Sequence, residues 1–211
     1  MADVLAVLDH ALGADADLDA SRLGVQGGSY GGYLTAMTIA ADHRFAAAPK
    51  ETPNVRVVRR EWKVLKKGLP ADGSIRVRAY EARADLLRAV IVGPKGTPYE
   101  GGLFFFDLQL PGDYPSRPPR MKYHSVAEER LNPNLYVDGK VCLSLLGTWA
   151  GPSWDPSGST VLQLLVSVQG LVLVEQPYFN EAGYEKQVGT EEGETNARLY
   201  NESARYLCLR G

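Results

Sequence analysis

Four short stretches of β-prone sequence follow one another along the middle of the chain, and they constrain the fold more than any other feature. They are residues 75–80, 86–92, 103–110 and 121–123. Turn residues separate them, among them the Gly- or Pro-containing pairs at 93–94, 101–102 and 111–112. Consecutive strands joined by turns usually pair with their neighbours along the chain, so we predict an antiparallel meander.

Helical patterns flank this meander. Residues 55–67 form a basic amphipathic pattern, with cations on the solvated side. Its apolar face comprises Val57, Val58, Trp62 and Leu65. Pro53 suits the first turn of this helix and Gly68 its end. Further helices are predicted at residues 160–173 and at about 193–209. A helix, a meander and then more helices indicate the α+β class.

The composition changes near residue 48. Residues 1–48 contain twelve Ala, six Asp and two Arg but no Lys, Glu or Trp, which gives them a formal charge of −4. Residues 49–211 have ordinary amounts of Lys, Glu, Pro and aromatic residues and carry a charge of +2. We therefore predict two parts, a helix–strand–helix fragment of residues 1–48 and a larger domain of residues 49–211.

Composition also limits the function classes. A net charge of −2 indicates neither a nucleic acid nor an anionic membrane as the main partner. There is no apolar run of about 18 residues, so we expect no membrane span. The two cysteines, Cys142 and Cys208, do not have metal-ligand spacing and are too few for a disulfide scaffold, so no metal site is expected. We expect a reducing compartment, the cytoplasm or the nucleus.

Three motifs occur in a fixed order in the larger domain. Residues 93–102 read GPKGTPYEGG, residues 110–119 read LPGDYPSRPP, and residues 132–134 are Asn-Pro-Asn, followed eight positions later by Cys142. Their order and spacing resemble those of the ubiquitin-conjugating (E2) enzymes, over residues 53–209. The flanking sequences at 131–136, 142–149 and 177–184 look like the large-E2 subgroup. That subgroup includes the plant phosphate-homeostasis E2 and the animal hybrid E2/E3 enzymes.

The resemblance implies that Cys142 accepts ubiquitin as a thioester from an activating enzyme and passes it to a substrate lysine. It implies no cofactor bound by the domain, because the activating enzyme uses the ATP. A thioester carrier needs a reachable thiol, so we expect Cys142 to be accessible; the alternative is a small buried hydrophobe. By resemblance, Asn134 stabilises the oxyanion or supports the loop facing the thiol; the alternative is a turn asparagine. Cys208, which lies in no motif, is interpreted as structural.

The resemblance also implies a surface that meets the activating enzyme and an E3 ligase. Its predicted members are Arg59, Arg60, Lys63, Pro115, Trp154 and Pro156. For the basic helix face, a merely solvated surface is the alternative. Ser116 stands where many E2s that work with RING ligases carry an aromatic residue, so we expect weak pairing with such ligases.

A second motif lies in the N-terminal part. Residues 27–31 read GGSYG, the Gly-x-Ser-x-Gly pattern of a nucleophile elbow, and residues 1–48 resemble a segment of prolyl-oligopeptidase-type serine peptidases. Ser29 matches their nucleophile, but the only downstream histidines, His43 and His124, do not have the setting that a catalytic triad requires. We interpret the fragment as a vestigial elbow from a gene fusion or an engineered chimera. Three functions remain: E2 transfer, a non-catalytic E2-fold binding module, and a serine hydrolase that uses Ser29.

Overall fold

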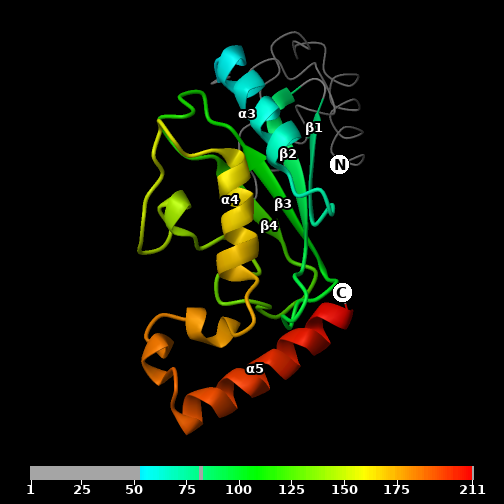
Figure 1. Cartoon of the computed structure of the whole chain (residues 1–211), viewed down its shortest axis with the longest axis vertical. Coiled ribbons are helices and arrows are strands. Elements are labelled where there is room, and N and C mark those ends of the chain that lie inside the picture. The colour runs from blue at the N-terminus through cyan, green and yellow to red at the C-terminus, as the bar shows by residue number, and fades with distance from the viewer. Residues whose placement is uncertain (1–52, 81–82, 211) are drawn as a thin grey trace, which may run out of the picture. The chain divides into compact units, whose positions relative to one another are not determined.

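The computed structural model describes residues 53–80 and 83–210, which belong to one compact unit, Thr52–Gly211 (Figure 1). Its longer elements are α3 (Val55–Gly68), β1 (Ile75–Tyr80), β2 (Arg83–Val92), β3 (Leu103–Gln109), β4 (Arg120–His124), α4 (Val161–Ser167) and α5 (Glu191–Arg210). The predicted elements of residues 1–48 and the elbow at Ser29 lie outside the described residues. The helix, the strands and the later helices confirm the predicted α+β class.

The predicted meander is confirmed. The four strands form one sheet in the order β1-β2-β3-β4, and every neighbouring pair is antiparallel. In β2, Leu87, Ala89 and Ile91 are buried while the residues between them are less so, as expected for a sheet with one covered face. This strand begins at Arg83, earlier than the sequence predicted, and the guanidinium of Arg83 pairs with Asp85 at 2.7 Å.

The outer face of the sheet carries a charged cluster. Asp107 on β3 accepts hydrogen bonds from Arg88 at 2.6 and 2.7 Å, and its Oδ2 lies 2.8 Å from Nε2 of His124. Burial alone would raise the pKa of Asp107, but these two partners outweigh it and hold that pKa below its ordinary value. The cluster therefore ties three neighbouring strands together through side chains.

Helix α3 has the predicted amphipathic arrangement. Val58 and Leu65 are buried, and the helix ends at Gly68, as predicted. The prediction for Pro53 is wrong, because the helix begins at Val55, two residues after the proline. Asn54 is the N-cap, its side chain accepts a hydrogen bond from the amide of Arg56 at 2.9 Å, and Pro53 lies before it.

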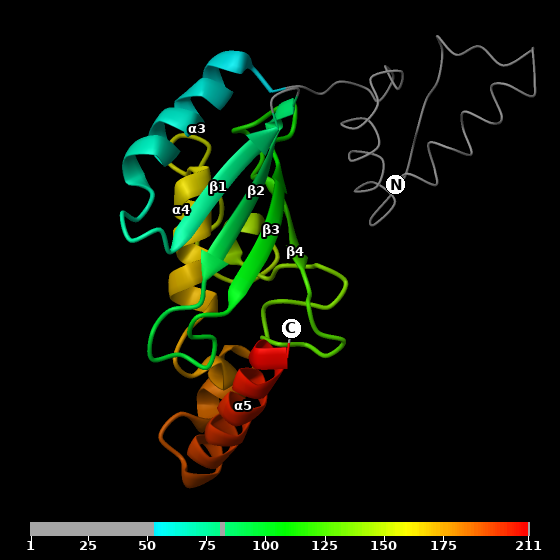
Figure 2. The ribbon, with the colours of Figure 1, turned by 90° about the vertical axis from the view of Figure 1, so that its right-hand side faces the viewer.

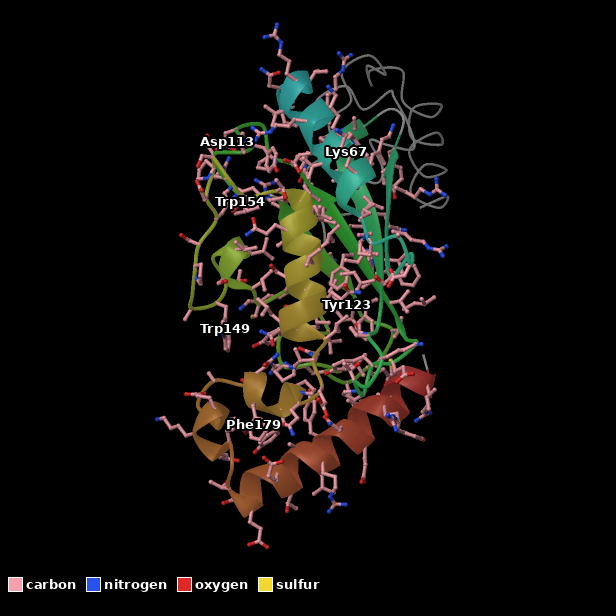
Figure 3. The ribbon with its side chains drawn as sticks, viewed as in Figure 1. Lys67, Asp113, Tyr123, Trp149, Trp154 and Phe179 are labelled. Atoms are coloured by element: carbon pink, nitrogen blue, oxygen red, sulfur yellow. The ribbon has the colours of Figure 1, made fainter. Side chains whose placement is uncertain are left out.

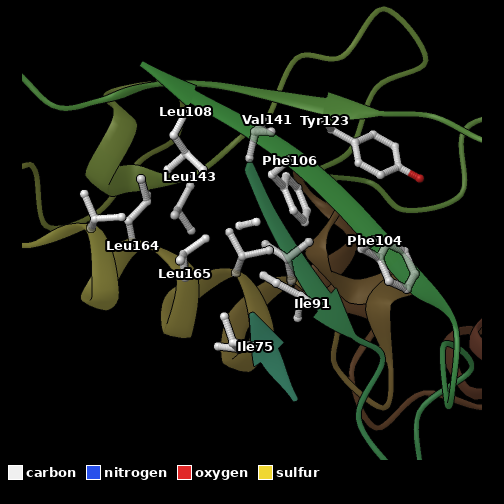
Figure 4. Packing of buried hydrophobic residues seen from close by; sticks show 14 of the residues in the cluster. Ile75, Ile91, Phe104, Phe106, Leu108, Tyr123, Val141, Leu143, Leu164 and Leu165 are labelled. Carbon is white, nitrogen blue, oxygen red and sulfur yellow. The ribbon is translucent and has the colours of Figure 1, made fainter. Parts of the chain in front are cut away.

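The predicted helix at residues 160–173 is two elements. An α-helix, α4, covers Val161–Ser167, and a π-helical turn continues it over Val168–Val172. Helices α3 and α4 lie on the same side of the sheet (Figure 2). Figure 4 shows Leu164 and Leu165 of α4 among the sheet residues of the hydrophobic core. The carboxylate of Glu61, a buried residue of α3, accepts a hydrogen bond from the amide of Val161 at 3.0 Å and so caps α4.

Helix α5 lies beyond the end of α4 (Figures 1 and 2). It covers Glu191–Arg210 and buries Ala197 and Ala204. Cys208 is half-buried against the core, and burial raises the pKa of its thiol. Gly102 fits beside it because a Cβ there would come within 2.4 Å of the Cys208 sulfur. Within residues 53–80 and 83–210, no helix is both long and apolar enough to cross a membrane.

Candidate active site around Cys142

The loop from Asn132 to Cys142 closes on itself. The amide of Cys142 donates to the carbonyl of Asn134 at 2.8 Å, and Nδ2 of Asn134 donates back to the carbonyl of Cys142 at 3.0 Å. Leu135 pairs with Val141 in an isolated antiparallel bridge. The eight-residue offset noted in the sequence thus brings the two predicted site residues into direct contact.

Asn132 anchors this loop to two distant segments. Its side chain is fully buried, with 0% of the residue exposed, and its Nδ2 donates to the Tyr99 hydroxyl at 2.9 Å and to the Val172 carbonyl at 2.7 Å. Its Oδ1 accepts from the amide of Asn134 at 2.7 Å. Burial raises the pKa of Tyr99 far above its ordinary value, so this phenol stays protonated and donates to the carbonyl of Leu131 at 3.2 Å.

The same geometry bears on the role of Asn134. Its Nδ2 is occupied by the Cys142 carbonyl, while its Oδ1 is buried without a hydrogen-bond partner among the described residues. The bond to that carbonyl uses one of the two Nδ2 hydrogens, so the second one stays available as a donor. The contacts therefore favour loop support, and the oxyanion role stays a prediction.

Cys142 lies at the wall of a cavity of about 450 Å³. Only 2% of the residue is exposed, which is less than the accessible thiol that we expected. The reason is the closed loop, which holds the Cys142 backbone inside the unit. A partner must therefore reach the thiol through the cavity.

Two kinds of side chain line this cavity. Trp149, Leu171 and Phe179 are apolar, and Trp149 and Leu171 are 38% and 60% exposed. Figure 3 shows Trp149 and Phe179 on the same flank of the molecule. Glu181 and Glu185 add two carboxylates. The cavity thus offers apolar surface and negative charge beside one thiol.

Arg130 joins the Asn-Pro-Asn loop to the acidic wall. Its guanidinium pairs with Glu181 at 3.0 Å, lies 4.0 Å from the centre of the Tyr136 ring, and donates to the carbonyl of Pro133. Sequence reasoning missed Arg130, Tyr99 and the anchoring contacts of Asn132. Tyr99 and Asn132 lie within the motifs noted in the sequence, but those motifs did not indicate these contacts, and Arg130 lies outside the three motifs.

The structure also brings together part of the predicted partner surface. Nε1 of Trp154 donates to the carbonyl of Pro115 at 2.7 Å, and the Trp154 and Tyr114 ring centres are 5.8 Å apart. Burial, and to a smaller extent the nearby Glu61, raises the pKa of Tyr114 well above its ordinary value. The loops that carry Pro115 and Trp154 are therefore held together; Figure 3 labels Asp113 and Trp154 in this region.

The remaining predicted members of this surface are exposed. They are Arg59, Arg60 and Lys63 on α3, and Pro156 in the loop after Trp154. Their roles in binding stay predictions. Among the residues that the structure describes, no group of three or more His, Cys, Asp or Glu side chains could hold a metal ion.

Comparison with known protein families identifies the family to which the chain belongs. The family model described as ubiquitin-conjugating enzyme matches residues 57–208, the part of the chain that forms the sheet, the cavity and the three longer helices. The chain therefore belongs to the ubiquitin-conjugating enzyme family.

Three individual proteins show how similar the chain is to known members of this family. The chain is 60% identical over 169 residues to Probable ubiquitin-conjugating enzyme E2 23 of Arabidopsis thaliana, covering 77% of this chain and 15% of that protein. It is 53% identical over 170 residues to Putative ubiquitin-conjugating enzyme E2 39 of the same plant, covering 79% and 52%. Human Dual E2 ubiquitin-conjugating enzyme/E3 ubiquitin-protein ligase BIRC6 is 47% identical over 150 residues, covering 67% and 3%. The match thus spans about half or less of each of these relatives.

A second family model, described as prolyl oligopeptidase family, matches residues 1–71. This match covers less than half of the chain and overlaps the other one at residues 57–71. In that overlap the structure has most of α3, whose Val58 and Leu65 belong to the core of the described unit. The overlapping segment is therefore built into the ubiquitin-conjugating fold, whereas Ser29 lies outside the described residues.

Proposed function

We propose that this chain accepts ubiquitin as a thioester on Cys142 and passes it to a lysine of a substrate protein. One observation carries the proposal. The only cysteine within the family's motif order lies on the wall of the cavity, and its backbone is bonded in both directions to Asn134. The domain itself needs no cofactor, because the ATP is consumed by the activating enzyme when it first makes a ubiquitin thioester.

The first step is transthiolation. The Cys142 thiolate attacks the carbonyl carbon of the thioester that joins ubiquitin to the activating enzyme. A new carbon–sulfur bond forms, the old one breaks, and the activating enzyme's cysteine leaves as a thiolate. The exposed cations Arg59, Arg60 and Lys63 on α3 supply the docking surface for the activating enzyme.

The second step is aminolysis. A neutral lysine amine attacks the thioester carbonyl, an isopeptide bond forms, the amine loses a proton to solvent, and Cys142 leaves as a thiolate. The carboxylate of Glu185 at the cavity attracts the incoming lysine, whereas that of Glu181 is paired with Arg130. Asn134 keeps the loop rigid through one Nδ2 hydrogen, which is bonded to the Cys142 carbonyl, and its second Nδ2 hydrogen donates to the oxyanion of the tetrahedral intermediate.

We further propose that the chain represents the large-E2 subgroup with hybrid E2/E3 character. Its Asn-Pro-Asn motif and its likeness to a protein named as a dual E2/E3 enzyme support this. Ser116 is exposed and offers no aromatic anchor to a RING ligase, which fits direct transfer to the substrate. Such a protein would act in the cytoplasm or the nucleus, where thiols stay reduced.

A charging assay tests the transfer. The chain is incubated with ubiquitin-activating enzyme, ATP and ubiquitin, and the products are separated with and without reducing agent. We expect a thiol-sensitive adduct that is absent in Cys142→Ala. In Cys142→Ser an adduct resistant to thiols is expected, because an ester replaces the thioester. Cys208→Ser is the matched control and should charge like the parent; an adduct that depends on Cys208 contradicts the assignment.

A second candidate function is a non-catalytic binding module. The 2% exposure of Cys142 favours it, since a buried thiol is ordinarily a packing residue. This alternative predicts that the chain binds ubiquitin or a ligase without ever forming an adduct. Chemical-shift perturbation with labelled ubiquitin, run beside the charging assay, separates the two functions.

A further inference from the structure

The hydroxyl of Thr148 bonds to the main chain on both sides of Cys142. Its Oγ1 donates to the carbonyl of Val141 at 2.7 Å and accepts from the amide of Leu143 at 2.9 Å. The amide of Thr148 also donates to the carbonyl of Leu143 at 3.3 Å. A single side chain six positions downstream thus bridges the residues before and after the thiol.

Thr148 and Asn134 together complete the support of the Cys142 backbone. Asn134 bonds to the amide and to the carbonyl of Cys142 itself, and Thr148 bonds to the adjoining carbonyl and the adjoining amide. Four consecutive polar groups of the main chain therefore have fixed partners. Since the sulfur is two bonds from this backbone, the position of the backbone largely sets where the sulfur lies.

The local chain is built to return Thr148 to the thiol. Ser144–Leu146 form one 3₁₀ turn after Cys142, and Gly147 ends it with a φ of 69°, a left-handed conformation that favours glycine. The amide of Gly147 donates to the carbonyl of Ser144 at 2.9 Å. This reversal directs the next residue, Thr148, back towards the start of the turn.

Thr148 also fixes one wall of the cavity. The next residue, Trp149, is 38% exposed and lines the cavity beside Cys142. The same anchor point therefore sets the thiol and the apolar wall past which a thioester must approach it. A shift of about 1 Å between reacting groups can cost on the order of 100-fold in rate.

We propose that Thr148 is a positioning residue, whose hydroxyl holds the main chain on both sides of Cys142 so that the sulfur meets a thioester in the cavity. The proposal rests on the proposed function, in which Cys142 carries ubiquitin. Thr148 acts through the backbone of Cys142 and touches neither ubiquitin nor the reacting atoms.

The test compares Thr148→Val, which has nearly the same shape but lacks the hydroxyl, with Thr148→Ser, which keeps it. Thr195→Val is the matched control, because Thr195 is exposed on α5 and lies far along the chain from the thiol. All variants carry Cys208→Ser, so that Cys142 is the only thiol. Thr148 is itself exposed, so its substitution leaves the hydrophobic core unchanged.

Two rates are measured well below the melting temperature, which is determined for each variant. For Thr148→Val we expect the kcat of charging to fall about 10-fold, with the KM for the activating enzyme within about 2-fold of the parent. Alkylation of Cys142 by iodoacetamide should rise several-fold in the same variant, because a loosened loop exposes the thiol. Thr148→Ser and Thr195→Val should keep both parental rates within about 2-fold.

Opposite changes in the two rates are the signature of positioning, since loss of fold alone would be visible in the melting temperature. Parental rates in Thr148→Val, or equal losses in Thr148→Val and Thr148→Ser, overturn the proposal. If Thr148→Val does not fold, Thr148→Ala removes the hydroxyl without pressing a methyl group on the Val141 carbonyl and is held to the same criteria. If the parent itself never charges, the proposed function fails, and the alkylation rates alone decide the role of Thr148.

Discussion

Replacing Asn132 by Ala should destabilise the domain more than any surface change. Asn132 is 0% exposed and makes three hydrogen bonds, two as a donor and one as an acceptor. Alanine leaves the carbonyl of Val172 and the amide of Asn134 without these partners. Each buried polar group that loses its partner costs about 1–3 kcal/mol. The Tyr99 hydroxyl keeps its bond to Leu131, so it adds little. The expected loss in the free energy of unfolding is therefore about 3 kcal/mol.

The assay is urea and thermal unfolding followed by circular dichroism. In a domain of about this size 1 kcal/mol lowers Tm by roughly 2–4 °C, so a fall of roughly 6–12 °C is expected. Asn132→Asp should cost still more at pH 8, because an acceptor replaces the donor that faces the Val172 carbonyl. Asn201→Ala is the control; its bond to the Glu175 carbonyl is exposed, and it should cost less than about 1 kcal/mol. A free energy of unfolding for Asn132→Ala within about 0.5 kcal/mol of the parent's, which is the size of an ordinary surface change, would refute the reasoning.

Three further outcomes are expected. Glu61→Ala removes the acceptor that caps α4 at Val161 and should cost about 1–2 kcal/mol in urea unfolding, while Glu61→Gln keeps an acceptor oxygen and should cost less; equal losses contradict the capping role. The pKa of Asp107 is lowered in the fold, so its contribution to stability is present above its unfolded pKa of about 3.9 and is lost as the pH falls through the folded value. The stability gap between the parent and Asp107→Asn, measured by urea midpoints, should therefore be large at pH 7 and narrow as the pH falls below about 3.9; a gap of constant size contradicts the role of Arg88 and His124 as partners of this carboxylate. A fluorophosphonate probe should leave Ser29 unlabelled because a triad needs an acid and a histidine, and labelling that disappears in Ser29→Ala contradicts this.

Local pattern was enough to predict most of the fold. The strands follow from short β-prone runs between turn residues, and α3 follows from apolar residues at helical spacing. The helix predicted at residues 160–173 was right in place but wrong in kind beyond Ser167, where the structure has a π-helical turn. This turn carries the Val172 carbonyl that accepts from Asn132, a contact between residues 40 positions apart that no local pattern records. Pro53 was wrongly placed in the first turn of α3 because Asn54, the next residue, is the N-cap, and its side chain accepts the hydrogen bond from the amide of Arg56.

The candidate site likewise has some features that the sequence predicted and others that it did not. The order of the motifs and the offset between Asn134 and Cys142 are enough to single out both residues from the sequence. The sequence did not indicate that Asn132 would bond to Tyr99, 33 positions earlier, or that Arg130 would bond to Glu181. Thr148 lies close to Cys142 in sequence, yet its role depends on the reversal at Gly147, which brings its hydroxyl back to the residues beside the thiol.

The sequence by itself determined the class of fold and the family and singled out Cys142 as the candidate nucleophile, because these inferences depend on periodicity and on the order and spacing of motifs along the chain. Only the tertiary structure decided how open that cysteine is, which atoms of Asn134 are committed, and which residues hold the loop in place. Hydrogen bonds require donor and acceptor to lie about 3 Å apart at a suitable angle, and such distances exist only once remote segments have packed together.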